Sequence, residues 1–163
     1  MANAEKLSFS DRFGGAPQSK QSLRLWLKLL SCTLIVEKRL RGRLDADFDT
    51  TLPRFDVLAA LERHPRGLKM SELSEFLMVS NGNVTGVVSR LIEDGLITRT
   101  VDRSDRRYAS VRLTRKGRDS FAKMAAANER WMESMFSDLS AGQAEELMRL
   151  LVRLRGSIEA HPI

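Results

Sequence analysis

Hydrophobic residues recur every three or four positions along most of this chain and alternate with polar residues in two short stretches. The spacing of three and four predicts six helices, which begin at about residues 20, 53, 71, 81, 115 and 141. Hydroxyl side chains that can cap free backbone N–H groups precede or open four of them, at Ser71, Ser80, Thr114 and Ser140. The alternating stretches, 97–101 and 109–113, predict two antiparallel strands.

The predicted helix 81–94 has one apolar face and one face of small polar groups. Its apolar residues fall at positions i, i+3, i+4 and i+7, which turns this face toward a core: Val84, Val87, Val88 and Leu91. The exposed positions are then Asn81, Asn83, Thr85, Gly86, Ser89 and Arg90. A solvated helix would carry more Glu and Lys, whereas small hydrogen-bonding groups suit a close approach to base edges and phosphates.

The order of the central elements is that of a winged helix-turn-helix. A short helix over 71–78, which would bury Leu73, Phe76 and Leu77, precedes the helix 81–94, and the two strands then flank a highly charged tip. We therefore expect a mainly α fold with a small two- to three-stranded β-wing. The expected divisions are a flexible arm (1–19), the N-terminal helix of a dimerisation region (20–50), the winged helix-turn-helix unit (51–114) and C-terminal dimerisation helices (115–163).

The terminal helices carry more apolar surface than the small central unit can cover. The last helix has an apolar stripe formed by Leu147, Leu150, Leu151, Leu154 and Ile158. Burial of these faces in a symmetric homodimer is the simplest explanation. Such a dimer would place its two reading helices about 34–36 Å apart, which is one turn of DNA.

The charge of the chain suits a polyanionic partner. The net charge is +6, and basic residues concentrate in 20–44 and 98–118. No apolar run is long enough for a membrane span or a signal peptide, and the single cysteine excludes an internal disulfide. We expect a cytoplasmic protein that binds double-stranded DNA.

Five motifs together resemble the MarR family of bacterial transcription regulators. They are LSEFL (73–77), VSNGNVT (79–85), LIEDGLI (91–97), DRSDRR (102–107) and LTRKG (113–117). The resemblance covers about residues 20–160 and implies a homodimer on a pseudo-palindromic operator, most often as a repressor released by a small molecule. It also implies that the second helix of the motif reads the major groove and that a wing arginine enters the minor groove.

Carried over by position, the resemblance implies nine DNA-binding residues. Those at the reading helix are Ser80, Asn81, Asn83, Thr85, Ser89 and Arg90. In the wing, Arg106 is the expected minor-groove residue, while Arg103 and Arg107 contact phosphates or pair with an aspartate. Asp105 would order the tip by pairing with an arginine.

The segment LRLWLKLLSCT (23–33) resembles the branch of the family that senses hydroxycinnamoyl-CoA and related aryl-CoA thioesters. In that interpretation Arg24 and Lys28 meet the phosphates of CoA, and Trp26 stacks on an aromatic or adenine ring. The alternative is that Trp26 belongs to the dimer core and that both cations are solvated. Apart from such an effector, no cofactor is expected.

Other functions have weaker support in the sequence. In a redox sensor, Cys32 would be the reactive residue. It lies in an apolar helix, however, which indicates a small buried side chain instead. His64 and His161 have no ligands at metal-binding spacing, so no metal site is expected.

An enzyme and an architectural DNA-binding protein are the remaining alternatives. An enzyme is not expected, because the chain has no phosphate-binding glycine loop and no recognisable nucleophile motif. A nonspecific architectural DNA-binding protein would carry Lys and Arg on its reading helix rather than neutral groups. The sequence-specific interpretation is therefore preferred.

Overall fold

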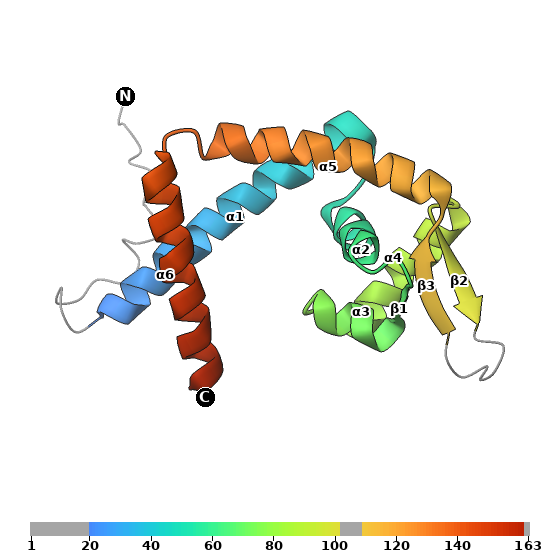
Figure 1. Cartoon of the computed structure of the whole chain (residues 1–163), viewed down its shortest axis with the longest axis horizontal. Helices are drawn as coiled ribbons and strands as arrows, with labels where there is room; N and C mark the ends of the chain where they lie inside the picture. Colours follow the sequence, from blue (N-terminus) through green and yellow to red (C-terminus); the bar gives the residue numbers. More distant parts are fainter. Residues whose placement is uncertain (1–19, 102–108, 162–163) are drawn as a thin grey trace, which may run out of the picture. The chain divides into compact units, whose positions relative to one another are not determined.

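The computed structural model describes residues 20–101 and 109–161 and confirms a mainly helical fold with a small sheet (Figure 1). The elements, in chain order, are α1 (Gln21–Phe48), α2 (Leu52–Glu62), β1 (Leu68–Lys69), α3 (Met70–Phe76), α4 (Asn81–Glu93), β2 (Ile97–Val101), β3 (Ala109–Leu113), α5 (Arg115–Met135) and α6 (Ala141–Ala160). They fall into two compact units, 1–125 and 126–163. The arm 1–19 and the wing residues 102–108 lie outside the described residues.

The first unit contains the winged helix-turn-helix. Its sheet is antiparallel with the order β1-β3-β2, and its register pairs Ile97 with Leu113 and Arg99 with Val111. Both predicted strands are confirmed. The sheet gains a third strand, β1, whose Leu68 also pairs with Val111; a two-residue strand is too short to show a periodic pattern.

One face of α4 supplies much of the core of this unit. Val84, Val88 and Leu91 are at most 2% exposed, as their spacing predicts, and Val87 is half-buried. They meet α2 and α3, where Leu58 and Leu73 are fully buried. Full burial of such side chains contributes about 1.5–3 kcal/mol each, so the inward face of α4 is strongly determined.

The short helix α3 begins and ends earlier than the sequence predicts. Lys69, not Ser71, is its N-cap residue, and the backbone N–H of Lys69 donates to Glu72 Oε2 at 2.8 Å. The predicted burial of Phe76 is wrong: the side chain is 44% exposed and its ring contacts His64 edge-on. The chain does not cover the side of α3 on which Phe76 lies.

The turn between α3 and α4 is a Schellman motif with a methionine at the position that glycine usually occupies. Met78 has φ 53°, its N–H donates to the Glu75 carbonyl, and the Val79 N–H donates to the Ser74 carbonyl. A left-handed conformation costs a residue with a Cβ about 1–2 kcal/mol. The Met78 side chain is 93% exposed, so packing does not offset this cost.

Met78→Gly is therefore expected to stabilise the protein by about 0.5–1 kcal/mol. The substitution relieves the backbone strain, and the greater conformational entropy of glycine in the unfolded chain offsets part of that gain. Urea denaturation followed by circular dichroism measures this as a higher midpoint with an unchanged slope. Met78→Ala is the matched control, because it removes the side chain and keeps the Cβ. Equal stabilisation by both variants would contradict the explanation.

The first turn of α5 lies against the turn that follows α4. Thr114 Oγ1 donates to the Gly95 carbonyl at 2.8 Å and accepts from the Gly117 N–H at 3.0 Å, which confirms Thr114 as the cap of α5. Gly117 is buried, and a Cβ built on it would lie 1.9 Å from the Leu96 carbonyl oxygen. The motif LTRKG thus encodes a cap and a close backbone contact.

The second unit contains α6, which begins with the predicted cap. Ser140 Oγ accepts from the Gln143 N–H at 3.3 Å, and Gln143 Oε1 accepts from the Ser140 N–H at 2.9 Å. None of the side chains of α6 is buried, and Leu147, Leu150, Leu151 and Ile158 are 41–65% exposed. The apolar stripe of α6 is therefore uncovered in the single chain.

No helix within 20–101 or 109–161 is both long enough and apolar enough to cross a membrane.

Candidate nucleic-acid interface

The outward face of α4 presents the small polar groups that the sequence predicts. Ser80, Asn83, Thr85 and Arg90 are exposed and Ser89 is half-buried. Asn81 lies in the first turn of the helix, and its side chain is outside the described residues. The structure therefore brings these predicted residues to one helix, over a core of valine and leucine.

Two glycines on α4 leave two positions of this exposed face without side chains. A Cβ built on Gly82 or on Gly86 meets nothing within 4 Å, so the fold does not require glycine at either position. Glycine inside a helix costs about 1 kcal/mol relative to alanine. Both positions are exposed, so their missing side chains leave room for a backbone or a base edge to approach α4 closely.

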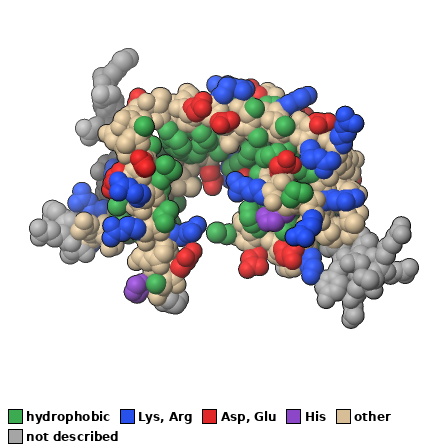
Figure 2. Space-filling view, viewed as in Figure 1, with side chains coloured by type: hydrophobic (Ala, Val, Ile, Leu, Met, Phe, Trp, Pro, Cys, Tyr) green, Lys and Arg blue, Asp and Glu red, His purple; other side chains and the backbone are tan. Residues whose placement is uncertain are grey.

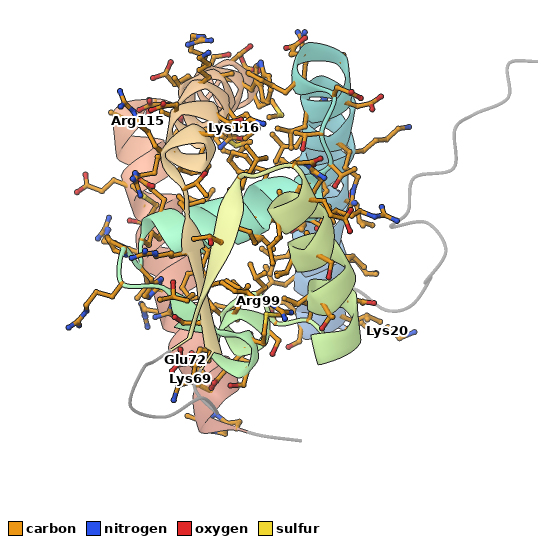
Figure 3. All side chains as sticks on the ribbon, turned by 90° about the vertical axis from the view of Figure 1, so that its right-hand side faces the viewer. Lys20, Lys69, Glu72, Arg99, Arg115 and Lys116 are labelled. Carbon is orange, nitrogen blue, oxygen red and sulfur yellow. The ribbon has the colours of Figure 1, made fainter. Side chains whose placement is uncertain are left out.

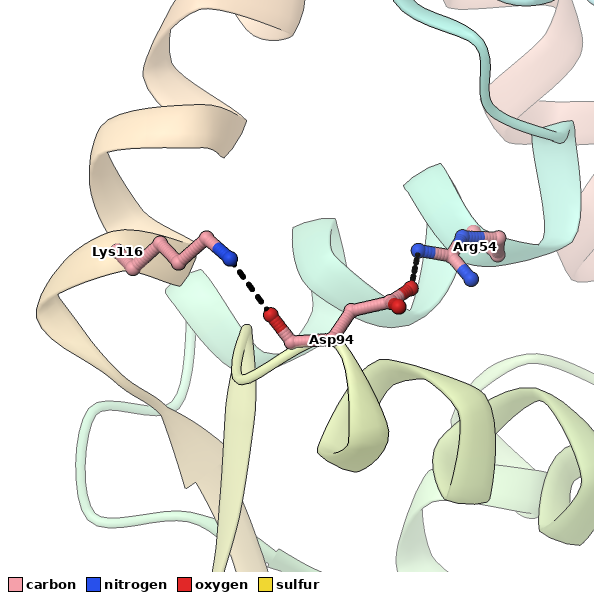
Figure 4. A network of polar contacts seen from close by, with 3 residues as sticks. All are labelled: Arg54, Asp94 and Lys116. Carbon is pink, nitrogen blue, oxygen red and sulfur yellow. Dashed lines mark hydrogen bonds and ion pairs between the residues drawn. The ribbon is translucent and has the colours of Figure 1, made fainter.

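A polar network fixes the C-terminal end of α4 (Figure 4). Arg54 Nη2 on α2 donates to Asp94 Oδ2 at 2.5 Å, and Lys116 Nζ on α5 donates to the Asp94 main-chain carbonyl at 2.8 Å. Asp94 therefore connects α2 and α5 to the C-terminal end of α4, the reading helix. Sequence reasoning missed the role of Arg54, because forty positions separate it from Asp94.

The strands of the wing add two exposed basic residues, which lie on opposite faces of the sheet. Arg99 on β2 and Arg112 on β3 are exposed, and Arg99 lies on the sheet near α4 (Figure 3). Lys and Arg side chains are also visible around the winged unit in the space-filling view (Figure 2). Arg103, Arg106 and Arg107 lie outside the described residues, so their roles stay predictions.

The predicted ligand residues Arg24, Trp26 and Lys28 are all exposed on the N-terminal part of α1. Arg24 and Lys28 are four positions apart and share a side of the helix, whereas Trp26 is rotated by about 200° from each. One protomer therefore does not bring all three to one point. Trp26 is 56% exposed, so it is not part of the core of the single chain.

Cys32 differs from its predicted environment. The sequence indicates a buried residue, but the thiol is exposed on α1, because the chain leaves most of this helix uncovered. Among the described residues, no group of three or more His, Cys, Asp or Glu side chains is arranged to hold a metal ion.

A winged helix-turn-helix with an open, hydrogen-bonding reading helix defines a DNA-binding transcription regulator. Three known proteins agree with this class. BadR, a transcriptional activatory protein of Rhodopseudomonas palustris, is 28% identical over 80% of this chain and 76% of its own. IacR, a transcriptional repressor of Pseudomonas putida, is 28% identical over 67% of this chain and 65% of its own. A crystal structure of a MarR family transcriptional regulator from Silicibacter pomeroyi is 32% identical, with a TM-score of 0.70 over 90% of this chain and 99% of that one.

A model of the MarR family also matches residues 48–107, which include α2 to β2. The chain belongs to the MarR family of transcription regulators. The family expected from the five motifs is thereby confirmed, as are the winged helix fold and a regulatory rather than enzymatic role.

Proposed function

We propose that this regulator is a homodimeric repressor that binds a pseudo-palindromic operator and is released by a small ligand, an aryl-CoA thioester. The observation that carries the proposal is the exposed face of α4. It offers amide and hydroxyl groups together with Arg90, rather than the lysines and glutamates of an ordinary solvated helix. These groups suit the direct reading of bases in a major groove.

The uncovered apolar residues of the terminal helices support the homodimer. On α1, Leu23, Trp26 and Leu34 share one side of the helix and are 38–56% exposed, and on α6 Leu147, Leu150 and Leu151 are 41–50% exposed. Contiguous apolar surface of this kind marks a protein interface. A second copy of the chain is the occupant proposed for it, since a twofold operator requires a twofold protein.

A repressive role is proposed from the usual behaviour of the family. The two relatives differ in this respect, because BadR is named an activatory protein and IacR a repressor. A reporter fused to the upstream region of the protein's own gene tests whether the protein represses or activates transcription. Repression predicts higher reporter output when the regulator is deleted, whereas lower output would identify an activator.

For the thioester, Arg24 and Lys28 are the proposed phosphate contacts, since both cations are exposed on one side of α1. Fluorescence anisotropy on DNA from upstream of the gene, with p-coumaroyl-CoA and then free p-coumarate, tests the ligand. Release by the thioester alone, lost in Arg24→Ala, is the expected result. Tight binding that neither compound affects would contradict the ligand and leave operator binding intact.

The same assay separates a sequence-specific regulator from an architectural protein. We expect operator DNA to bind at least about 10³-fold more tightly than random DNA. With about 6–10 phosphate contacts, the slope of log K against log salt should be about −5 to −9. Equal affinity for the two DNAs would contradict sequence-specific recognition.

Asn83→Ala and Arg90→Ala are each expected to weaken operator binding by about 1–3 kcal/mol, because each removes a group that contacts a base edge. Part of the loss should depend on the base at the contacted position. Lys123→Ala, at an exposed position of α5, is the control for the loss of one positive charge. If these two variants lost no more operator affinity than the control, neither side chain would contact a base.

A further inference from the structure

The side chain of Met78 is 93% exposed, the largest exposed fraction of any large hydrophobic residue within 20–101 and 109–161. It extends from a turn position with φ 53°, where glycine would fold at lower cost. Burial within the chain therefore does not account for a methionine at this position. A residue kept in a strained backbone conformation indicates a role other than folding.

The turn holds Met78 next to the start of the reading helix. The Met78 N–H donates to the Glu75 carbonyl and the Val79 N–H donates to the Ser74 carbonyl, both at 3.1 Å. Ser80, two residues after Met78, is the N-cap residue of α4. The Cα atoms of Met78 and Ser80 are therefore at most about 7 Å apart, the span of two extended residues.

This turn lies at the end of the winged unit that a DNA duplex must approach. The N-terminal end of α4 and the C-terminal end of β2 lie at the same end of this unit (Figure 3). At the opposite end of α4, Asp94 is held by Arg54 and Lys116. A reading helix and a wing that contact one duplex meet it where they lie together. This step rests on the proposed operator binding.

Met78 adds an apolar group to a surface that is otherwise suited to hydrogen bonding. The exposed residues that follow it, such as Ser80, Asn83 and Thr85, carry hydroxyl or amide groups. The C5-methyl group of thymine is the apolar feature of the major groove, and proteins recognise it by apolar contact. A methionine side chain is apolar and flexible, so it can adapt to such a contact.

We propose that Met78 is a specificity-determining residue, which contacts the methyl group of one thymine in each operator half-site. The proposal explains why a strained position carries a large side chain that packing within the chain does not use. Glycine would lower the cost of folding, but it would remove the contact with DNA. Stability and operator recognition therefore favour different residues at position 78.

Four substitutions of Met78 test the contact by fluorescence anisotropy on operator and random DNA. Met78→Ala should weaken operator binding at least about fivefold, because it removes most of the apolar surface buried against DNA. Met78→Gly should lose as much although it folds more stably, so unfolding cannot explain the loss. Met78→Leu should keep most of the affinity, whereas Met78→Gln, of similar size but polar, should not. Unchanged operator affinity in Met78→Ala would overturn the proposal.

Removal of single methyl groups from the operator identifies the partner of Met78. Each thymine is replaced in turn by 2′-deoxyuridine, which lacks only the C5-methyl group. In the natural protein, one such replacement should cost about three- to fourfold in affinity, as expected for one buried methyl group. The same replacement should cost nothing in Met78→Ala. If every replacement had the same effect on both proteins, Met78 would contact no thymine methyl and the proposal would fail.

Two further outcomes separate this inference from its alternatives. Light scattering should find Met78→Ala in the same oligomeric state as the natural protein, and a change of state would assign Met78 to a protein interface instead. Operator binding by the natural protein tests the proposed function itself. Its absence would overturn both proposals, whereas normal operator binding by Met78→Ala would overturn only the role of Met78.

Discussion

Replacing Gly117 with alanine is expected to destabilise the protein by about 3 kcal/mol, because the new methyl group has no space. It would lie 1.9 Å from the Leu96 carbonyl oxygen and 2.9 Å from the Leu96 carbonyl carbon. Both neighbours are backbone atoms, and the same Leu96 oxygen accepts from the Thr114 N–H at 3.0 Å. The start of α5 must therefore move away from the end of α4, which breaks this bond.

Thermal and urea denaturation measure the effect of Gly117→Ala. A loss of about 3 kcal/mol corresponds to a fall in Tm of roughly 6–12 °C for a chain of this size. Weaker operator binding at temperatures where the variant is folded would show that the junction also orients α4. The variant thus tests both the stability and the position of the reading helix.

Gly42→Ala is the matched control for this substitution. Gly42 is also helical, inside α1, but a Cβ on it meets nothing within 4 Å. Alanine there should stabilise by up to about 1 kcal/mol through helix propensity. If both variants gave the same change in stability, steric contact with Leu96 would not be the reason why glycine stands at position 117.

Leu151→Asp is expected to have the second large effect, on assembly and hence on operator binding. Leu151 is 41% exposed in the apolar stripe of α6, and the proposed homodimer would bury it. An unpaired carboxylate in such an interface costs several kcal/mol, and a symmetric dimer carries it twice. Light scattering after size exclusion should find a monomer, and operator affinity should fall at least about 100-fold because the two half-sites are no longer linked.

Gly156→Asp introduces the same side chain on another side of α6, about 140° around the helix from Leu151. Nothing lies within 4 Å of a Cβ at this position. This control should stay dimeric and bind operator normally. A fully dimeric Leu151→Asp protein would show that the interface lies elsewhere.

The sequence alone predicted the six helices, the two longer strands and the inward face of α4, because these depend on local spacing. The positions of Val84, Val88 and Leu91 followed from a helical period, and the two main strands followed from alternation. The same pattern left the polar face of α4 exposed, which is what identified a DNA-reading helix. The capping residues Thr114 and Ser140 were also readable, since a cap acts within one turn of its helix.

The tertiary structure decided the features that join distant segments. Two examples are the pair formed by Arg54 and Asp94 and the contact of Gly117 with Leu96. Each depends on where segments that are distant in the sequence meet. Exposure of Phe76 and Cys32 likewise depended on which helix faces the chain covers, and periodicity cannot report this. A local pattern determines which face of an element is apolar, but only packing in three dimensions determines what that face meets.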